Sequence, residues 1–542
     1  MIGTCDRYVS TGGRALTYRA PMSEITSVAG IIRHHGRERP DSVAIVDGDR
    51  SCTWAELLER SQRAAQALAA AGVGPDDRVA FFDKNSTEHF EVFFGAAMHN
   101  AVCVDPNWRL APPEVRFIVD DAEAKVLVYH ADFAALVTAI ADDLPHVREF
   151  VVIGGDGTGP HTDYEAWLAA HEPADPGVPS GPDDIAFQLY SSGTTGLPKG
   201  VLISNDNFFA LLPAASEIWS MTDESVVLAA MPLFHIGGGG WAVAAMYLGC
   251  TVVLMRDLDP MALAALVDQH SITHAFLVPA VLTFVLLTPD LDPSQLSTME
   301  IVVYGASPIS EEVLTKSLEV WGCEFWQAYG LTETTGAIVN LPPADHDPAG
   351  PNKHRLRSCG VPGPGVELRI VGDDGHELPA GEVGEIWVRS PQVMLGYWKR
   401  PEATAEAIVD GWFHTGDAGY VDADGYLYIH DRIKDMIVSG GENVYPAEVE
   451  NAFMAHPAVA DVAVIGVPDD KWGEVGKALV VAAEGAEPDP DEILTFARQR
   501  LAGFKVPKSI EFVAALPRNP SGKVLKHELR APYWEGRDRA VN

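Results

Sequence analysis

The sequence predicts an α/β protein with a large N-terminal domain and a small α+β C-terminal domain. We expect the large domain to contain two stacked αβ sub-domains and a small β-barrel. Three observations predict this arrangement. Short apolar strands alternate with helical stretches over roughly the first 350 residues, a glycine-rich stretch of short strands begins near Cys359, and a compact α+β pattern follows residue 435.

The first region begins with a helix that a capping box of Thr53 and Glu56 opens and that ends near Gly72. A strand (78–82), a helix (89–99) and another strand (101–105) follow. Further apolar strands are predicted at 125–130, 150–154, 186–190, 226–230, 251–255, 274–278 and 300–305. Such short apolar runs between helices are typical of buried parallel strands. They are too numerous for one small sheet, so we expect two stacked sub-domains.

The remaining elements divide the chain near Lys434. Residues 359–390 alternate short strands with DDG and AGE turns, which predicts a small β-barrel or β-layer. Later, helices are predicted at 446–456 and 491–501, and strands at 459–467, 477–484 and 509–515. The domain limits that follow are 26–433 and 434–542, and residues 1–25 are interpreted as a disordered lead-in.

The composition excludes several classes of partner. The net charge is −37, from 39 Lys and Arg against 76 Asp and Glu, so we expect no binding to nucleic acid. Six scattered cysteines without a CxxC pair indicate reduced thiols, and the N-terminus has no apolar leader, so a cytoplasmic protein is expected. The most apolar run, 241–255, is too short to span a bilayer and predicts a buried helix followed by a buried strand.

The loop YSSGTTGLPKGV, residues 190–201, has the composition of a phosphate-binding loop. Its glycines let backbone N–H groups point inward, its hydroxyl groups add donors, and Lys199 adds positive charge. The spacing does not fit the GxxxxGK[ST] pattern of the common phosphate loop. From the loop alone, a polar surface turn remains the alternative.

Together with other motifs, this loop resembles the adenylate-forming superfamily of acyl-CoA synthetases, luciferases and peptide-synthetase adenylation domains. The same order is found for MPLFHIGG (231–238), YGAS (304–307), YGLTET (329–334), HTGD (414–417), DRIKDMIVSGGENVYPAEVE (431–450) and NPSGKVLK (519–526). The resemblance runs from about residue 40 to 530. It implies that a carboxylate attacks the α-phosphate of ATP to form an acyl-adenylate, and that a thiol then takes the acyl group.

For the first half-reaction, the resemblance assigns residues to each part of ATP. Glu333 would hold Mg²⁺ with the hydroxyl of Ser191 nearby, and Thr332 would contact the α-phosphate; without the motif, Glu333 could equally cap a helix. The phosphate loop would comprise Ser191, Ser192, Gly193, Thr194, Thr195, Gly196 and Lys199. The nucleoside would be held by Gly305, Ala306 and Ser307 beneath adenine, Tyr329 stacked on the base, and Asp417 with Arg432 on the ribose.

The C-terminal motifs are assigned to catalysis and to the thiol. Lys523 would lie between the substrate carboxylate and the α-phosphate and neutralise charge in the transition state. A mobile C-terminal domain would turn about a hinge at Lys434 after the adenylate forms. CoA would then contact Gly440, Gly441 and Trp472, with Glu474 close by, although the last two also fit the start of a plain surface helix.

His235 and the four glycines after it resemble the family's acyl pocket, and His235 is a catalytic-site candidate as well as a possible core histidine. We expect the glycines to leave an open acyl channel that Trp241 limits. A Trp241→Ala variant would then shift the preferred chain length.

The resemblance is greatest to bacterial fatty-acyl-CoA and aryl-CoA synthetases. Because MPLFHIGG lacks an acidic group for an ammonium ion, an amino-acid substrate is disfavoured. We predict a carboxylate–CoA ligase for a medium or long fatty acid, with ATP and CoA as co-substrates, Mg²⁺ as cofactor and a homodimer as an option. The alternatives are a ligase that loads a carrier protein and a silent nucleotide-binding protein; the joint presence of Lys523, Glu333, Asp417 and Arg432 disfavours the latter.

Overall fold

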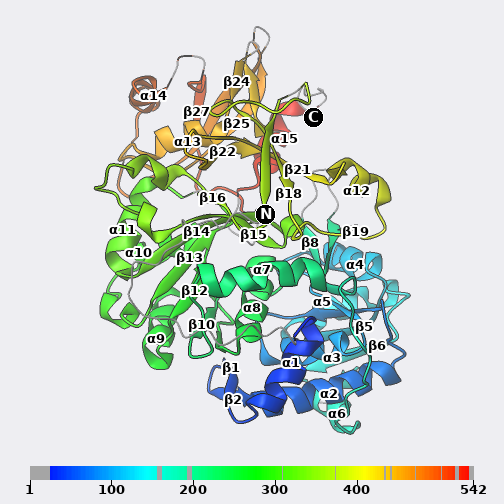
Figure 1. Ribbon diagram of the computed structural model, residues 1–542. Helices are drawn as coiled ribbons and strands as arrows, with labels where there is room; N and C mark the ends of the chain where they lie inside the picture. The colour runs from blue at the N-terminus through cyan, green and yellow to red at the C-terminus, as the bar shows by residue number, and fades with distance from the viewer. Residues whose placement is uncertain are drawn as a thin grey trace, which may run out of the picture.

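A computed structural model of the chain has a large α/β body and a smaller unit above it that contains the C-terminus (Figure 1). The structure describes residues 25–155, 161–191, 198–307, 309–372, 374–432, 435–439, 442–469, 472–486, 488–501, 503, 505–518 and 524–535. The predicted combination of a large N-terminal α/β part and a small C-terminal α+β part is confirmed.

The largest sheet of the body has nine strands. In spatial order they are β16 (Val361–Pro362), β15 (Gly336–Leu341), β14 (Glu324–Leu331), β13 (Ile301–Gly305), β12 (His274–Leu277), β10 (Val226–Ala229), β11 (Thr251–Leu254), β1 (Val43–Asp47) and β2 (Arg50–Thr53). The four strands predicted at 226–230, 251–255, 274–278 and 300–305 are adjacent and parallel within it. β1 and β2 were not predicted; β1 pairs in parallel with β11, Ile45 opposite Val252.

A second, five-stranded sheet is parallel throughout. Its strands, in order, are β4 (Val102–Val104), β3 (Arg78–Phe82), β5 (Ala124–His130), β6 (Glu149–Ile153) and β7 (Thr162–Asp163). One continuous hydrophobic core contains side chains from both sheets and from the helices α1 (Val28–Glu38), α2 (Trp54–Ala70), α3 (Thr87–Ala97) and α8 (Trp241–Leu248). The two α/β layers are therefore stacked, as predicted.

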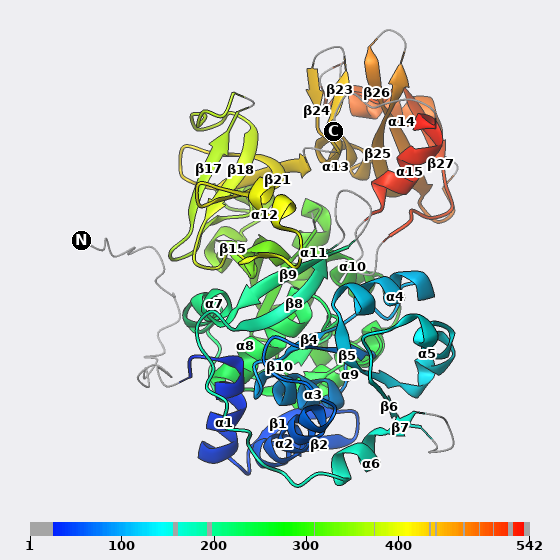
Figure 2. The same cartoon turned by 90° about the vertical axis from the view of Figure 1, so that its right-hand side faces the viewer.

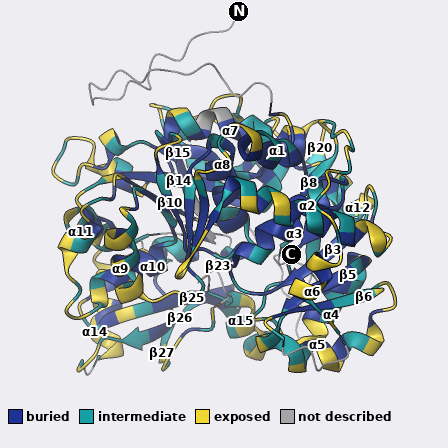
Figure 3. Cartoon of the chain, turned by 90° about the horizontal axis from the view of Figure 1, so that it is seen from below, coloured by how far each residue is buried: buried dark blue, intermediate teal, exposed yellow. Residues whose placement is uncertain are grey.

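Helices cover the outer faces of the two sheets. The nine-stranded sheet packs against α9 (Pro260–His270), α10 (Pro279–Leu287) and α11 (Glu311–Trp321). The five-stranded sheet packs against α4 (Pro112–Asp121) and α5 (Ala134–Ile140). Exposed residues gather on the outside and buried strands lie inside (Figure 3).

The predicted capping box of α2 is present, with the Thr53 amide donating to Glu56 Oε2 at 2.8 Å.

Two antiparallel sheets complete the body. One contains β17 (Glu367–Val371), β18 (Gly384–Arg389), β20 (Ile408–Val409), β21 (Trp412–Val421) and β22 (Leu427–Arg432), where the small β-barrel or β-layer was expected. The other has the order β19 (Gly396–Tyr397), β9 (Lys199–Ser204) and β8 (Ile185–Ser191). The strand predicted at 186–190 is thus present, but its expected place in a parallel sheet is wrong, because it pairs antiparallel with β9.

The C-terminal unit lies beside β17, β18 and β21, above the two α/β layers of the body (Figure 2). Its sheet comprises β24 (Glu442–Val444), β23 (Ile437–Ser439), β26 (Gly473–Ala482), β25 (Val459–Asp469) and β27 (Ser509–Phe512). Its helices are α13 (Pro446–Met454), α14 (Pro490–Arg498) and α15 (Lys526–Trp534). Helix α13 corresponds to the prediction at 446–456 and α14 to that at 491–501. In the described part of the chain, no helix is long and apolar enough to cross a membrane.

Three histidines are buried and neutral in this fold. Burial lowers the pKa of His35, His274 and His346 to about 4 from the ordinary value of 6.5. Their rings donate to backbone carbonyls: His35 Nε2–H to Tyr247 O at 3.0 Å, for example. Each ring must therefore take up a proton when the chain unfolds near pH 5.

We expect the free energy of unfolding to fall as the pH is lowered from 6.5 to 5. Because the folded pKa lies below the unfolded one, the unfolded state binds more protons in this window, at up to about 1.4 kcal/mol per pH unit for each histidine. Urea titrations across this range would measure the slope. His274→Asn should lower the slope, and the exposed His376→Gln should not; equal slopes in all three proteins would contradict the prediction.

Candidate nucleotide and acyl site

The candidate site lies at the carboxyl ends of the central strands of the nine-stranded sheet, where ligands bind in open parallel α/β sheets. β13 ends at Gly305, and a Cβ atom there would come within 2.1 Å of the Ala328 carbonyl oxygen on β14. Ala306 follows with φ of +65°, a left-handed conformation that strains a residue other than glycine, and it is exposed. Gly305 therefore lets β13 lie close against β14, and the exposed Ala306 directly after it is the residue available for the predicted contact with a flat ring.

Glu333 connects the phosphate-loop strand to the turn after β14. It lies in the 3₁₀ turn Thr332–Thr334, and its Oε1 accepts hydrogen bonds from Ser191 Oγ and from Tyr397 Oη, both at 3.1 Å. The Lys199 ammonium lies 4.9 Å from the centre of the Tyr397 ring. The predicted neighbours Ser191, Glu333 and Lys199 are thus together, and Tyr397 is an additional member that the motifs did not indicate.

These groups suit a magnesium ion. Mg²⁺ prefers oxygen ligands from one or two carboxylates together with substrate phosphates and water. The Glu333 carboxylate has hydroxyl groups on Oε1, and no bond to its Oε2 is found within the described residues. Glu333 would hold the ion, with Ser191 beside it; the ion would bind phosphate oxygens and offset their charge.

A second polar pair is formed by Tyr329 and Asp417. The Tyr329 hydroxyl donates to Asp417 Oδ2 at 2.8 Å, and both residues are buried. The amide of Asp417 donates to Thr415 Oγ1 at 3.0 Å, a bond within the HTGD segment of β21. Arg432 is the backbone partner of Asp417 across β21 and β22. Tyr329 therefore orients the Asp417 carboxylate that is predicted to bind ribose. Only stacking of Tyr329 on the base was predicted, and this hydrogen bond was not.

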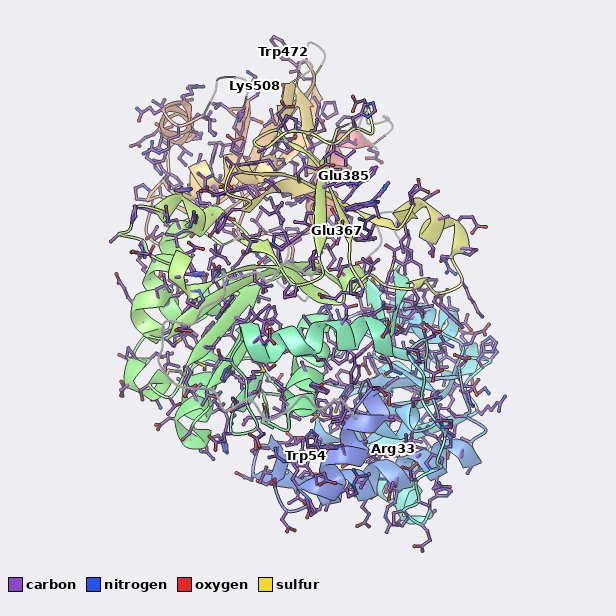
Figure 4. The ribbon with its side chains drawn as sticks, viewed as in Figure 1. Arg33, Trp54, Glu367, Glu385, Trp472 and Lys508 are labelled. Carbon is purple, nitrogen blue, oxygen red and sulfur yellow. The ribbon has the colours of Figure 1, made fainter. Side chains whose placement is uncertain are left out.

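The HTGD segment of β21 has contacts with β18 that sequence reasoning missed. The Gly416 amide donates to Glu385 Oε1 at 3.0 Å, and Glu385 lies on β18 (Figure 4). Two residues along β18, the Trp387 indole stacks on the His414 ring with centroids 3.9 Å apart. The only sequence signal was the apolar-polar alternation of GEIWVR, which does not reveal its partner strand.

The glycines after His235 are tightly packed and form a short π-helical turn over Ile236–Gly240. A Cβ atom on Gly238 would lie 2.0 Å from the Pro232 carbonyl oxygen, and one on Gly239 would lie 2.4 Å from that of Leu233. The expectation that these glycines leave an open channel is therefore wrong at both positions, because the backbone folds back on itself there.

Trp241 belongs to the core. It is 5% exposed, its indole N–H donates to the Leu228 carbonyl at 3.2 Å, and its ring packs against Trp219 and Phe276. A Trp241→Ala substitution would remove a large core side chain, so a change in chain-length preference would not report on a channel wall alone.

His235 and the space beside it lie at the carboxyl ends of β10 and β11. Burial lowers the pKa of His235 to about 4, so the ring is neutral at physiological pH, and its Nε2 has no hydrogen-bond partner within the described residues. A small cavity of about 40 Å³ there is lined by Asn85, Trp108, Arg109, Ala230, Pro232, Arg256, Asp257 and Leu258. The Arg109 guanidinium lies over the Trp108 ring at 4.1 Å. Sequence reasoning did not single out this basic and aromatic group.

Trp472 and Glu474 have different environments. Trp472 is 42% exposed beside the end of β25, with its amide donating to Asp469 Oδ1 at 2.8 Å. Figure 4 places it at the outer end of the C-terminal unit. Glu474 is 4% exposed within β26. Of these two predicted CoA neighbours, only Trp472 offers a large surface to a ligand.

Several predicted site residues lie outside the described residues. They are Ser192, Gly193, Thr194, Thr195, Gly196, Lys434, Gly440, Gly441 and Lys523. Their roles, and the part of the Arg432 side chain, stay predictions.

Comparison with known proteins extends over nearly the whole chain. Residues 32–398 match the AMP-binding enzyme family, and residues 448–523 match the AMP-binding enzyme C-terminal domain. The chain is 44% identical to the fatty acid–[acyl-carrier-protein] ligase ScoC of Streptomyces coeruleorubidus, covering 94% of this chain and 96% of that protein. It is 40% identical to a feruloyl-CoA synthase of an Amycolatopsis species, covering 92% and 97%.

Solved structures agree with this comparison. ATP-bound MatB from Rhodopseudomonas palustris superimposes with a TM-score of 0.84 at 32% identity, covering 93% of this chain and 99% of that one. The same overall arrangement is therefore present in a structure that holds ATP.

Proposed function

Since the chain belongs to the AMP-binding enzyme family, we propose that it is an ATP-dependent carboxylate–CoA ligase that acts on a medium or long fatty acid. The observation that carries this proposal is the joint placement of two polar pairs, Ser191 with Glu333 and Tyr329 with Asp417, at one end of the nine-stranded sheet. One pair suits a metal-bound polyphosphate and the other suits a ribose diol.

In the first half-reaction, an oxygen of the substrate carboxylate attacks the α-phosphorus of ATP, and pyrophosphate leaves. Two anions approach each other, so the protein must supply positive charge and hydrogen-bond donors. We assign Lys199 to the phosphates and Lys523 to the charge that develops between carboxylate and α-phosphate. Asp417, oriented by Tyr329, would accept from the ribose hydroxyl groups and hold the nucleotide in line.

In the second half-reaction, the thiol sulfur of CoA attacks the acyl carbon of the acyl-adenylate, loses its proton, and AMP leaves. The cavity at the carboxyl ends of β10 and β11 supports a route for this thiol, because Arg109 in its lining can donate to a CoA phosphate, whereas Arg256 is already bonded to Asp83. The neutral His235 ring, three residues after the lining residue Pro232, has a nitrogen without a partner among the described residues. We assign it to contact with substrate rather than to charge stabilisation.

A carrier protein is the second candidate thiol donor. The 44% identity to a protein named as a fatty acid–[acyl-carrier-protein] ligase favours this alternative. The 40% identity to a feruloyl-CoA synthase supports CoA. Both alternatives share the first half-reaction and differ only in the acceptor, so one assay can separate them.

Pyrophosphate release across a panel of straight-chain and aromatic acids tests the proposal. We expect release with fatty acids of medium or long chain, and acyl-CoA formation when CoA is added. Acyl-adenylate that transfers to a purified holo-carrier protein but not to CoA would establish the second candidate. Preference for an aromatic acid would contradict the proposed acyl class, and no release with any acid would contradict the ligase itself.

A further inference from the structure

A separate cavity of about 220 Å³ opens at the amino ends of strands β3, β5 and β6. The cavity at the carboxyl ends of β10 and β11 lies beyond the opposite end of β3. Strand β3 has five residues and is therefore roughly 16 Å long. Ligands of parallel α/β sheets bind at the carboxyl ends of strands. The residues that line this cavity include none of those assigned to the nucleotide site or lining the cavity at the carboxyl ends of β10 and β11.

A buried arginine forms one wall of this cavity. Arg78 is 3% exposed, its Nε–H donates to Gln188 Oε1 at 2.9 Å, and an Nη1–H donates to the Asp76 carbonyl. The Trp398 ring covers one face of the guanidinium, with Cζ 3.6 Å from the ring centre. A guanidinium has five N–H donors, so three remain without a partner among the described residues.

The partners of Arg78 are all uncharged, unlike those of comparable arginines. Burial lowers the pKa of Arg60 and of Arg256 as well, but Arg60 is bonded to Glu91 and Glu165, and Arg256 to Asp83, and these carboxylates outweigh burial and raise the pKa of both. For Arg78, burial is the largest influence and lowers its pKa. The buried charge of Arg78 is thus left without a bonded carboxylate in the described part of the chain, an arrangement that is costly unless a counter-ion binds.

The carboxylates that line the cavity are largely engaged elsewhere. Asp77 is paired with Lys125 at 2.5 Å, and Glu123 is paired with Lys399 at 2.5 Å. Asp76 is exposed at the rim, where its backbone has φ of +59°. Two of the three lining carboxylates are therefore neutralised by lysines.

Arg148 supplies a second cation to the same cavity. Its Nη1 contacts the Gly72 carbonyl at 3.5 Å, and no ion pair to it is present among the residues the structure describes. Arg78 and Arg148 supply two positive charges, and Asp76 is the one lining carboxylate not paired with a lysine. The net charge of these three groups is therefore +1. Two guanidinium groups around a small cavity suit a tetrahedral oxyanion, which can accept from several directions.

We propose that this cavity binds a phosphate group, held by Arg78 and Arg148 and separate from the nucleotide site. The phosphate is either free inorganic phosphate or the phosphate of a nucleotide. The proposal goes beyond the ligase activity and does not depend on the identity of the acid or of the thiol.

Calorimetric titration of inorganic phosphate into the full chain tests the proposal, with the nucleotide site saturated by α,β-methylene-ATP. We expect one saturable site. Arg148→Ala removes an exposed side chain, so the fold should persist, and the dissociation constant for phosphate should rise at least tenfold. Arg37→Ala is the matched control, because Arg37 is also exposed and its loss changes the net charge equally.

Absence of saturable binding, or equal weakening by Arg148→Ala and Arg37→Ala, would overturn the proposal. Equal weakening would mean that phosphate is attracted to the protein by its positively charged side chains in general and not by this cavity. Competition by adenosine 3′,5′-bisphosphate would identify a nucleotide phosphate as the ligand, and lack of competition would identify free phosphate; either result requires the site.

Discussion

Replacing Glu333 by glutamine is expected to lower acyl-adenylate formation at least about 100-fold, the usual cost of losing one charge-stabilising group in an active site. The amide can still accept from Ser191 and Tyr397, so the turn should keep its shape. The lost charge should weaken the hold on Mg²⁺. We therefore also expect a higher Mg²⁺ concentration for half-maximal pyrophosphate release.

Glu402 provides the control for this substitution. It is exposed on α12 (Pro401–Ala407), so Glu402→Gln removes the same charge without touching the site. Unchanged Mg²⁺ dependence in Glu333→Gln would show that the carboxylate only positions the turn, and the metal assignment would then be wrong.

Replacing Lys523 by alanine is expected to separate the two half-reactions. Acyl-adenylate formation should fall about 100-fold to 1,000-fold, because the charge between carboxylate and α-phosphate loses its partner. Thioester formation from supplied acyl-adenylate should be nearly unchanged, since the domain movement predicted from the family resemblance would by then have moved Lys523 away. Rapid-quench assays of each half-reaction would measure both effects.

Lys508→Ala is the matched control, because Lys508 is an exposed lysine of the same C-terminal unit (Figure 4). An equal loss in both half-reactions of Lys523→Ala would argue that the residue supports the fold of the domain. An undiminished first half-reaction would remove Lys523 from the catalytic group.

Local patterns predicted the buried strands well, because an apolar run between turn signals can be recognised as a strand without knowing which strand it pairs with. They did not predict β1, because its apolar run is short and the strand is stabilised by pairing with the distant β11. In that pairing Ile45 lies opposite Val252. The antiparallel pairing of β8 with β9 was also missed, because an apolar strand looks alike in either direction.

For the site, motif order identified residues that the fold brings together, such as Ser191 with Glu333. Contacts between distant segments were out of reach. The Tyr397 bond to Glu333 joins residues 64 positions apart, and no spacing rule connects them. The closed packing of Gly238 and Gly239 was misread, because an absent side chain can mean free space or a close backbone, and only coordinates distinguish the two.

The π-helical turn at Ile236–Gly240 also restricts how this enzyme could be redesigned. Side chains cannot be added at Gly238 or Gly239 without moving carbonyl oxygens of the same segment, and at Gly237 a Cβ atom would lie 2.8 Å from the Phe276 ring. A substitution at Gly238 or Gly239 would therefore require the backbone to shift, whereas one at Gly237 would require the Phe276 ring to move. Phe276 is a partly buried side chain on the separate strand β12. Replacing it with a smaller or larger residue would change the space beside the glycines without a substitution in the turn.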